Sequence, residues 1–375
     1  MMKSDAVSLP TFDSIAFCGG CAKGAYHIGV WKALDELGLT SSVRAVSGTS
    51  IGALNAALFA LGDWNQARDV WFSVRESTAF SIGKSGDGVF SRDGLLKILN
   101  RLDLARLRKS PVQVFCNIHE LGAAKPESVR LNPLPPQRQR EILLASSAMP
   151  LIYETVEIQG KRYVDGGVTA LGNTPVEVLY RHQGRNILIL SLKENFDFTI
   201  RDGLLGETDL YALCQGANLH VIAPLESLNH TAFNGVLPDF DFSARAVKAK
   251  MIAGYQDAKK QLSEMESVYM MRNDYAKMNT YIRLKMQKMF SKGEEIQVFL
   301  DTTNFSWLNV PMRVAGIYAD LVNIDGWRVQ QDKLLKRHYR IVDSSGVCRA
   351  YTFNPNDLIA ALDSYDATIK FMDLP

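Results

Sequence analysis

The sequence lacks several features that would place a protein in a specialised class. It has no apolar stretch long enough to span a bilayer, no internal repeat and no low-complexity tract. Its 42 Lys and Arg residues nearly balance 40 Asp and Glu residues, and a net charge of +2 gives no signal for nucleic-acid binding. With 375 residues, 47% of them hydrophobic, the chain can bury the core of one large or two modest domains.

Cysteine usage and the first residues indicate the compartment. The 5 cysteines are odd in number and scattered, which argues against a disulfide framework. Cys18 and Cys21 form a C-x-x-C pair, but no second Cys or His pair completes a metal site, so we expect no metal and no cofactor. Asp5 precedes the first apolar segment, which does not fit a secretory signal. We therefore expect a cytoplasmic protein.

A serine flanked by glycines lies between a strand-like and a helix-like segment. Gly48-Thr49-Ser50-Ile51-Gly52 follows the mostly apolar run Val43 to Ser47 and precedes the helix-like run Ala53 to Ala60. This is the setting of a G-x-S-x-G nucleophile elbow. Side chains at positions 48 and 52 would collide with the adjoining strand or helix. An ordinary Gly-rich turn has the same pattern, so the motif alone does not establish an enzyme.

A second glycine turn lies upstream. Ser14 to Cys18 is strand-like, Gly19-Gly20-Cys21-Ala22-Lys23-Gly24 is a loop, and Ala25 to Leu34 has helical spacing. Unpaired N–H groups in such a loop can hold an anion, either the phosphates of a dinucleotide or the oxyanion of an acyl-transfer intermediate. The dinucleotide interpretation is disfavoured, because Cys21 replaces the second glycine of G-x-G-x-x-G and no acidic residue ends the second strand.

An aspartate follows a candidate hairpin. Two short extended segments surround Gln159-Gly160, and the second ends in Asp165-Gly166-Gly167. A carboxylate held there can accept a serine proton and return it to a leaving group. An Asp-Gly turn without function is the common alternative.

Together the three segments resemble the patatin-like phospholipase family. That family has a Gly-rich oxyanion loop ending in a basic residue and glycine, then G-x-S-x-G, then D-G-[GA]; here these are Gly19 to Gly24, Gly48 to Gly52, and Asp165 to Gly167. Further stretches that look like the family are Ala145 to Pro150, Asn173-Thr174-Pro175, Asp241 to Ser243 and Gly254 to Ala258. The resemblance covers residues 12 to 262 approximately.

The resemblance implies a role for each motif. Ser50 and Asp165 would form a catalytic Ser–Asp dyad, and the backbone N–H groups of Gly19, Gly20 and Cys21 an oxyanion hole. Supporting roles fall to Lys23, Gly24, Gly48, Gly52, Gly166 and Gly167. Lys23 could equally be a solvated residue at a helix start. The family usually has glycine where Cys21 stands, and a Cβ there costs on the order of 1 kcal/mol if the position needs a positive φ.

A Ser–Asp–His triad is the competing arrangement. The α/β-hydrolases place a histidine after the acid, and His182, His220 and His230 are the candidates, with His230 the best of them. None lies in a recognisable loop signature, whereas the resemblance implies a dyad without histidine. His27, on the helix after the glycine loop, is expected to be a packing residue.

Alternation of segments predicts the fold. Strands expected at Ser14–Phe17, Val43–Ser47, Val112–Ile118 and Asn186–Leu192 alternate with helices. This order predicts an α/β fold with a mostly parallel central sheet flanked by helices on both faces. Residues 61 to 110 are expected to be helical, including Trp64 to Val74 and Asp93 to Leu104. A long amphipathic helix is expected to run from Ser243 past Gln261.

The acyl hydrolase domain is expected to span residues 12–270, with a C-terminal appendage at 271–375. Segment 272–292 interleaves Lys and Arg with apolar residues, so it could rest on an anionic membrane or pack its apolar side on the core. In the appendage we expect strands at Glu295–Leu300, His338–Val342 and Ala350–Phe353, and a short helix at Asn356–Leu362.

The sequence thus predicts a lipid acyl hydrolase of phospholipase A or lysophospholipase type. Its partners would be a phospholipid or another acyl-ester lipid and, transiently, a membrane surface; nucleic acid is not expected. No calcium loop is present in the sequence. The alternative is a catalytically weak or inactive patatin-like protein that binds lipid or a partner, which only Cys21 favours.

Overall fold

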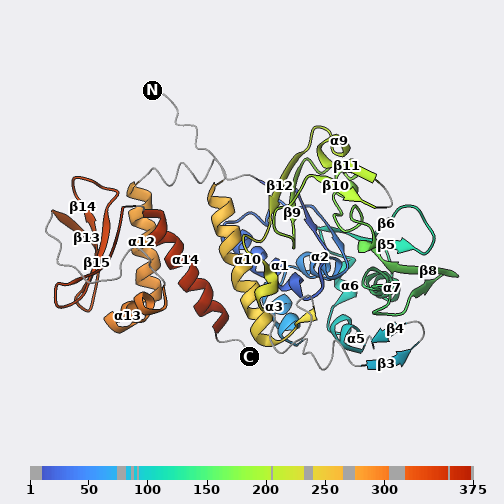
Figure 1. Ribbon diagram of the computed structural model, residues 1–375, viewed down its shortest axis with the longest axis horizontal. Helices are drawn as coiled ribbons and strands as arrows, with labels where there is room; N and C mark the ends of the chain where they lie inside the picture. The colour runs from blue at the N-terminus through green and yellow to red at the C-terminus, as the bar shows by residue number, and fades with distance from the viewer. Residues whose placement is uncertain are drawn as a thin grey trace. The chain divides into compact units, whose positions relative to one another are not determined.

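The chain divides into two compact units (Figure 1). The computed structural model describes residues 11–73, 82–85, 88–90, 93–203, 206–231, 240–264, 275–303, 317–353 and 355–372. One unit covers residues 11–258 and the other residues 259–373. The assignment of hydrolysis to residues 12–270 and of an unknown role to residues 271–375 stays a prediction.

A sheet of eight strands forms the centre of the first unit. Its order is β12-β9-β1-β2-β5-β8-β7, and β6 also pairs with β5. The parallel strands are β1 (Ser14–Phe17), β2 (Ala45–Thr49), β5 (Gln113–Glu120), β9 (Asn186–Leu190) and β12 (Asn218–Ile222). The antiparallel ones are β6 (Glu127–Arg130), β7 (Val156–Ile158) and β8 (Lys161–Asp165). Burial of Ile187 to Leu190 explains why β9 has no polar face.

Helices flank this sheet, so the predicted fold class is confirmed (Figure 1). The longer ones are α1 (Ala25–Glu36), α2 (Ile51–Leu61), α3 (Trp64–Ser73), α7 (Pro136–Ser146) and α10 (Ala244–Glu264). The short helices are α5 (Asp93–Leu99), α6 (Leu104–Leu107), α8 (Glu177–Arg181) and α9 (Leu210–Leu213), with single turns η1 (Cys21–Gly24), η2 (Gly166–Val168) and η3 (Leu228–Thr231). Two small hairpins complete the unit: β3 (Ile82–Ser85) with β4 (Gly88–Phe90), and β10 (Thr199–Asp202) with β11 (Gly206–Asp209).

Two glycines allow α1 and α10 to cross at backbone contact. A Cβ on Gly29 would lie 1.8 Å from the carbonyl oxygen of Met251, and a Cβ on Gly254 would lie 2.1 Å from that of Tyr26. No side chain fits at either position without separating the helices. The crossing fixes α10 against the helix that follows the glycine loop.

We expect Gly29→Ala to lower the free energy of unfolding by about 3 kcal/mol, because overpacking against a backbone cannot be relieved by a rotamer change. The control is Gly203→Ala, since a Cβ there meets no atom within 4 Å. Urea denaturation of both variants measures the difference. Equal stabilities would show that the two helices can separate at little cost.

The described part of the second unit contains an antiparallel sheet and helices that share a core with it. The sheet order is β13 (Tyr318–Ile324), β14 (Trp327–Asp332), β15 (Tyr339–Val342) and β16 (Cys348–Thr352). The helices are α12 (Tyr275–Met289), α13 (Gly293–Thr302) and α14 (Pro355–Met372). Fully buried side chains from all of these layers form one core, including Met286, Phe299, Val329, Ile341 and Leu362. The Lys285 ammonium, between Asp363 and Asp366, pairs α12 with α14.

Three sequence expectations differ from the structure. Residues 61 to 110 are not helical throughout, because β3 and β4 form a hairpin there. Residues Glu295 to Leu300 belong to helix α13, not to a strand; the Glu295 carboxylate accepts from the N–H groups of Ser291 and Lys292 and so caps the helix start. The short helix expected at Asn356–Leu362 extends to Met372.

The basic segment 272–292 is mostly helix α12, and residues 272–274 lie outside the described part. Its apolar side packs inward: Met278, Ile282, Met286 and Phe290 are all buried. That side is therefore not available to a membrane. Membrane contact by the protein itself stays a prediction.

Candidate functional site

Ser50 occupies a strained turn between β2 and α2. Its backbone has φ 56° and ψ −128°, a conformation with positive φ that is uncommon for a residue with a side chain. A Cβ on Gly48 would lie 2.2 Å from the carbonyl oxygen of Gly52, and one on Gly52 would lie 2.2 Å from that of Phe17. Both glycines are therefore required for the close approach of β1, β2 and α2. The serine is placed at the N-terminus of α2, where negative charge is favoured.

The glycine loop lies beside this turn. β1 and β2 are neighbouring parallel strands, so the segments that follow them meet at one edge of the sheet. A Cβ on Gly19 would lie 3.2 Å from the Cβ of Ser50. Gly20 precedes the turn η1, which the Lys23 N–H closes by donating to the Gly20 carbonyl at 3.0 Å. Cys21 adopts φ 49°, the positive value at which its Cβ costs on the order of 1 kcal/mol.

Asn173 is bound to the glycine loop. The Gly19 N–H donates to Asn173 Oδ1 at 3.1 Å, and Asn173 Nδ2 lies 3.4 Å from the Gly19 carbonyl. A Cβ on Gly167 would lie 2.9 Å from the same Oδ1, so Asn173 joins the glycine loop to the Asp165 loop. In this arrangement the Gly19 N–H is already engaged. Its predicted role in an oxyanion hole would require Asn173 to move, and that role stays a prediction.

Asp165 ends β8 and is buried, with 4% of its surface exposed. Its Oδ1 accepts from the Gly167 N–H at 2.7 Å. Its Oδ2 is buried and has no hydrogen-bond partner of ordinary geometry among the described residues. Burial, the largest effect, raises the pKa of Asp165 to about 6, against the lowering effects of the Ser50 side chain and the Gly167 N–H. The free Oδ2 is the atom that can take up a proton.

The end of α7 holds both candidate catalytic residues. Ser146 Oγ accepts from the Ser50 N–H at 2.9 Å and donates to the Asn117 carbonyl at 2.7 Å. Two residues further on, the Ala148 carbonyl accepts from the Asp165 N–H at 2.9 Å. Ser146 and Ala148 lie in the family-like stretch Ala145 to Pro150, for which the sequence alone predicts no role. The only signal in the sequence was a pair of serines, Ser146 and Ser147, between two alanines.

The two glycines after Asp165 serve close packing. A Cβ on Gly166 would lie 2.5 Å from the Asn117 carbonyl of β5, and Gly24 is likewise confined by Ile51 and Trp71. Neither Gly166 nor Gly167 has a positive φ. Space, not backbone freedom, therefore accounts for glycine at these positions.

Two of the candidate histidines, His220 and His182, lie away from Ser50. His220 is on edge strand β12, three strand spacings from β2, or about 14 Å. His182 ends α8, before the start of β9, whereas Ser50 follows the end of a strand parallel to β9. His27 is buried between the Leu190 carbonyl and Asn55, and burial lowers its pKa to about 3. The side chain of His230 lies outside the described residues.

A cavity of about 240 Å³ lies next to Gly19 and Asn173. It is located at the carboxyl ends of β1 and β9, where the chain connections leave in opposite directions along the sheet. Ligands of open α/β sheets bind at such a switch point. Its lining mixes apolar side chains, among them Leu192, Phe196 and Ile200, with the polar residues Asn173 and Lys193.

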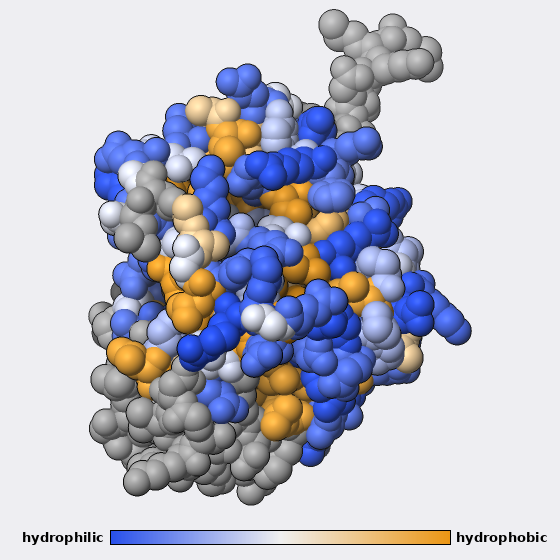
Figure 2. All heavy atoms as spheres, turned by 90° about the vertical axis from the view of Figure 1, so that its right-hand side faces the viewer, coloured by the Kyte–Doolittle hydropathy of each residue, from blue (hydrophilic) through white to orange (hydrophobic). Residues whose placement is uncertain are grey.

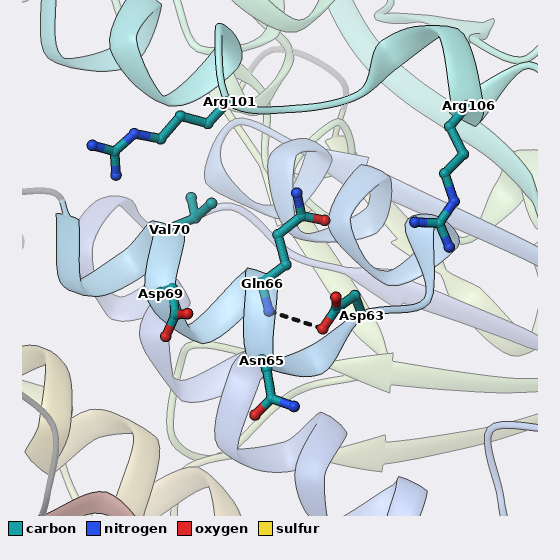
Figure 3. A pocket seen from close by; sticks show the side chains of 7 residues that line it. All are labelled: Asp63, Asn65, Gln66, Asp69, Val70, Arg101 and Arg106. Atoms are coloured by element: carbon teal, nitrogen blue, oxygen red, sulfur yellow. Dashed lines mark hydrogen bonds between the residues drawn. The ribbon is translucent and has the colours of Figure 1, made fainter.

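Another cavity, of about 460 Å³, shares no residue with this site. It is lined by polar and charged side chains of α3 and of the segment around α6, including Arg101 and Arg106 (Figure 3). Asp63 there accepts from the Gln66 N–H at 3.0 Å and so caps α3. We assign it no role in catalysis.

The face in Figure 2 corresponds to the right-hand end of Figure 1, where β6 and β8 lie. Among its coloured residues, hydrophobic side chains form several separate patches with hydrophilic ones between them. No helix among the described residues is both long and apolar enough to cross a membrane. The described residues also contain no cluster of His, Cys, Asp and Glu that could hold a metal ion.

A strained serine turn between a strand and a helix of a mostly parallel α/β sheet resembles the nucleophile elbow of ester hydrolases. Comparison with protein families identifies the kind. Residues 15–180 match the family model described as patatin-like phospholipase, so this part of the chain is a patatin-like phospholipase domain. The family resemblance is confirmed over residues 15–180, and the match supports hydrolysis of a lipid ester; the resemblance predicted for residues 181 to 262 stays a prediction. The sequence matches no curated protein.

Solved structures show only distant similarity. VipD from Legionella pneumophila is 14% identical, with a TM-score of 0.38 over 78% of this chain and 79% of that chain. The type III effector protein ExoU is 16% identical, with a TM-score of 0.30 over 81% of this chain and 67% of that chain. The complex of SpcU with ExoU from Pseudomonas aeruginosa gives 16% identity and a TM-score of 0.29 over 76% and 63%. At TM-scores this low, no residue role is transferred.

We expect Ser146→Ala to lower kcat about tenfold, because the Ser50 N–H would lose its acceptor and the strained turn its anchor. KM should change little, since Ser146 is buried behind the turn. The matched control is Ser147→Ala, because the Ser147 hydroxyl donates, among the described residues, only to the Leu143 carbonyl. Steady-state kinetics on a soluble ester distinguish the two. Equal kcat values would mean that Ser146 does not position the turn.

Asp165→Asn should stabilise the fold at neutral and alkaline pH. The folded-state pKa of about 6 exceeds the ordinary value of 3.8. The stability that Asp165 contributes is thus complete below about pH 4 and is lost as the pH rises through about 6, by about 3 kcal/mol. A neutral amide does not suffer this loss. The Tm gain of Asp165→Asn should grow between acid and alkaline pH, whereas that of the exposed-site control Glu157→Gln should not.

Proposed function

We propose that the protein is a serine lipid acyl hydrolase of phospholipase A or lysophospholipase type, with Ser50 as nucleophile and Asp165 as general base. The observation that carries the proposal is that one short stretch, Ser146 to Ala148, holds both a strained Ser50 and a buried Asp165 whose Oδ2 is available to a proton. The match to the patatin-like family over residues 15–180 supports an ester of a lipid as the substrate.

The reaction follows from these positions. Asp165 takes the proton of the Ser50 hydroxyl while Oγ attacks the ester carbonyl carbon. Collapse of the tetrahedral intermediate breaks the ester bond, and Asp165 returns the proton to the departing alcohol. Water then attacks the acyl-serine and gives a proton to Asp165, which passes it to Ser50 Oγ as the acyl ester bond breaks and the fatty acid leaves. The raised pKa makes Asp165 a stronger base than an exposed carboxylate, yet leaves it ionised at neutral pH.

The oxyanion would be stabilised by N–H groups of the glycine loop and by the N-terminus of α2. Each donor in comparable sites contributes roughly 3 kcal/mol to the transition state. Gly20 and Cys21 are the proposed donors, and Gly19 would join them only after releasing Asn173. The cavity beside Gly19 would then receive part of the substrate.

Ser50→Ala and Asp165→Asn should each abolish fatty-acid release from mixed phospholipid vesicles without added calcium. Losses of at least about a thousandfold are expected, because nucleophile and base act as a unit. Single substitutions of His182, His220 and His230 serve as controls and should leave most activity. A folded histidine variant that is inactive would replace the dyad with a triad.

The activity on a soluble ester should follow the ionisation of Asp165. We expect kcat/KM to fall about tenfold per pH unit below about 6 and to be flat above it. A profile with a midpoint near that of an exposed carboxylate would mean that another group accepts the proton.

A second function, lipid or partner binding without turnover, is favoured by one observation. Cys21 holds a positive φ at a position where the family usually has glycine. If strain there distorts the loop, Cys21→Gly should raise the activity severalfold. If wild type and Cys21→Gly are both inactive on all vesicles, the binding function is the better account.

A further inference from the structure

One end of the C-terminal sheet gathers segments that are far apart in the sequence. In the antiparallel order β13-β14-β15-β16, Tyr318 pairs with Asp332, and Tyr339 pairs with both Gln331 and Thr352. The start of β13, the loop from β14 to β15 and the end of β16 therefore meet at the same end.

Four large hydrophobic side chains are exposed at this end. The exposed fractions are 58% for Ile317, 79% for Leu334, 53% for Leu335 and 56% for Phe353. One exposed leucine is ordinary on a protein surface, but a group at one sheet end indicates an interaction site. We call these residues, together with the loop 333–337, the sheet-end patch.

The loop is held in place, so its leucines are not simply unpacked. Asp332 Oδ1 accepts from the N–H groups of Leu334 at 2.7 Å and Leu335 at 2.8 Å. The Asp332 N–H donates to the His338 carbonyl at 2.9 Å, and the Asp332 carbonyl accepts from the Lys336 N–H at 3.1 Å. These bonds fix the backbone with both leucine side chains in solvent.

The patch has a stacked base. The His338 ring stacks on Phe353 at 4.3 Å between centroids, and His338 Nδ1 lies 3.0 Å from the Tyr318 hydroxyl oxygen. The backbone N–H of Lys333 donates to the Ile317 carbonyl at 2.9 Å. Each exposed hydrophobic residue is thereby attached to an ordered framework.

Cations border the leucines. Lys333, Lys336 and Arg337 are exposed, and none forms an ion pair with the described residues. The nearest carboxylate in sequence, Asp332, is buried and already accepts two backbone N–H groups. The patch is therefore an apolar loop tip bordered by positive charge.

An anionic bilayer surface complements both properties. Leucines reach the boundary between headgroups and acyl chains, while Lys and Arg remain at the level of the phosphates. Three uncompensated cations are attracted to anionic lipid and add about fivefold each to the partition coefficient. Helix α12, the other basic segment, has most of its apolar side buried and exposes one leucine, Leu284, where the sheet-end patch exposes two in a single loop.

We propose that the sheet-end patch binds anionic membranes, with Leu334 and Leu335 inserted and Lys333, Lys336 and Arg337 against the lipid phosphates. This goes beyond the proposed hydrolysis and does not depend on it. The binding is therefore tested in the full-length Ser50→Ala protein, which should not consume the lipid. If the Ser50→Ala protein binds vesicles but the wild type does not hydrolyse the lipid, only the proposed hydrolysis is contradicted and the proposed membrane binding stands.

Flotation with vesicles of phosphatidylcholine, with and without phosphatidylserine, measures the binding. We expect binding to the phosphatidylserine vesicles that weakens at high salt. Leu334→Ser combined with Leu335→Ser should lower the partition coefficient at least about tenfold on both vesicles. Lys333→Glu combined with Arg337→Glu should remove the preference for phosphatidylserine.

Matched controls lie on α12 in the same unit. Leu284→Ser removes another leucine that is 61% exposed, and Arg283→Glu combined with Lys288→Glu makes the same change in charge at exposed positions. Both α12 variants should bind the vesicles as strongly as the parent protein. The Tm of every variant is measured to confirm that it is folded. Loss of binding in the α12 variants but not in the patch variants would overturn the proposal. The proposal would also be overturned if the parent protein did not bind the vesicles, or if the parent and all variants bound equally well.

Insertion is tested separately with Leu334→Trp. Tryptophan emission of this variant should shift to shorter wavelength on phosphatidylserine vesicles, beyond any shift of the parent. The same spectrum with and without vesicles would show that the loop stays in water, which overturns the proposal.

Discussion

The close approach of β1, β2 and α2 at the Ser50 turn is the constraint on which the site depends. Gly48 and Gly52 leave no room for a Cβ, so the strands and the helix meet at backbone distance. The positive φ of Ser50 occurs at that contact. Strain of this kind persists only where the surrounding structure determines it, and here an eight-stranded sheet does so.

Burial of Asp165 is the electrostatic counterpart of this constraint. Only one of its oxygens has a backbone donor, and its surroundings disfavour the charged form. The fold thus holds a carboxylate in an environment that destabilises it when ionised. Such an arrangement is costly for stability and suits a group that must accept a proton.

The sequence predicted the fold class, the hairpin before Asp165 and the glycine turns, because strands, turns and collisions at glycine follow local rules. The sequence did not predict helix α13, because Ile296, Val298 and Leu300 alternate with other residues as they would in a strand. The segment is a helix because Glu295 caps its start and Phe299 packs into the core. The engagement of Gly19 by Asn173 joins residues that are 154 positions apart, and no spacing rule shows it. The pKa of Asp165 likewise depends on a three-dimensional environment.

The bonds from the end of α7 have a consequence for motion. Ser146 holds the amide of Ser50 and Ala148 holds the amide of Asp165, so nucleophile and carboxylate are attached to the same short stretch of chain. Small displacements of that stretch would carry both groups together and leave their separation nearly constant. A modification or contact on the exposed side of α7 could then shift the pair relative to the glycine loop, changing the alignment with an oxyanion without disturbing proton transfer.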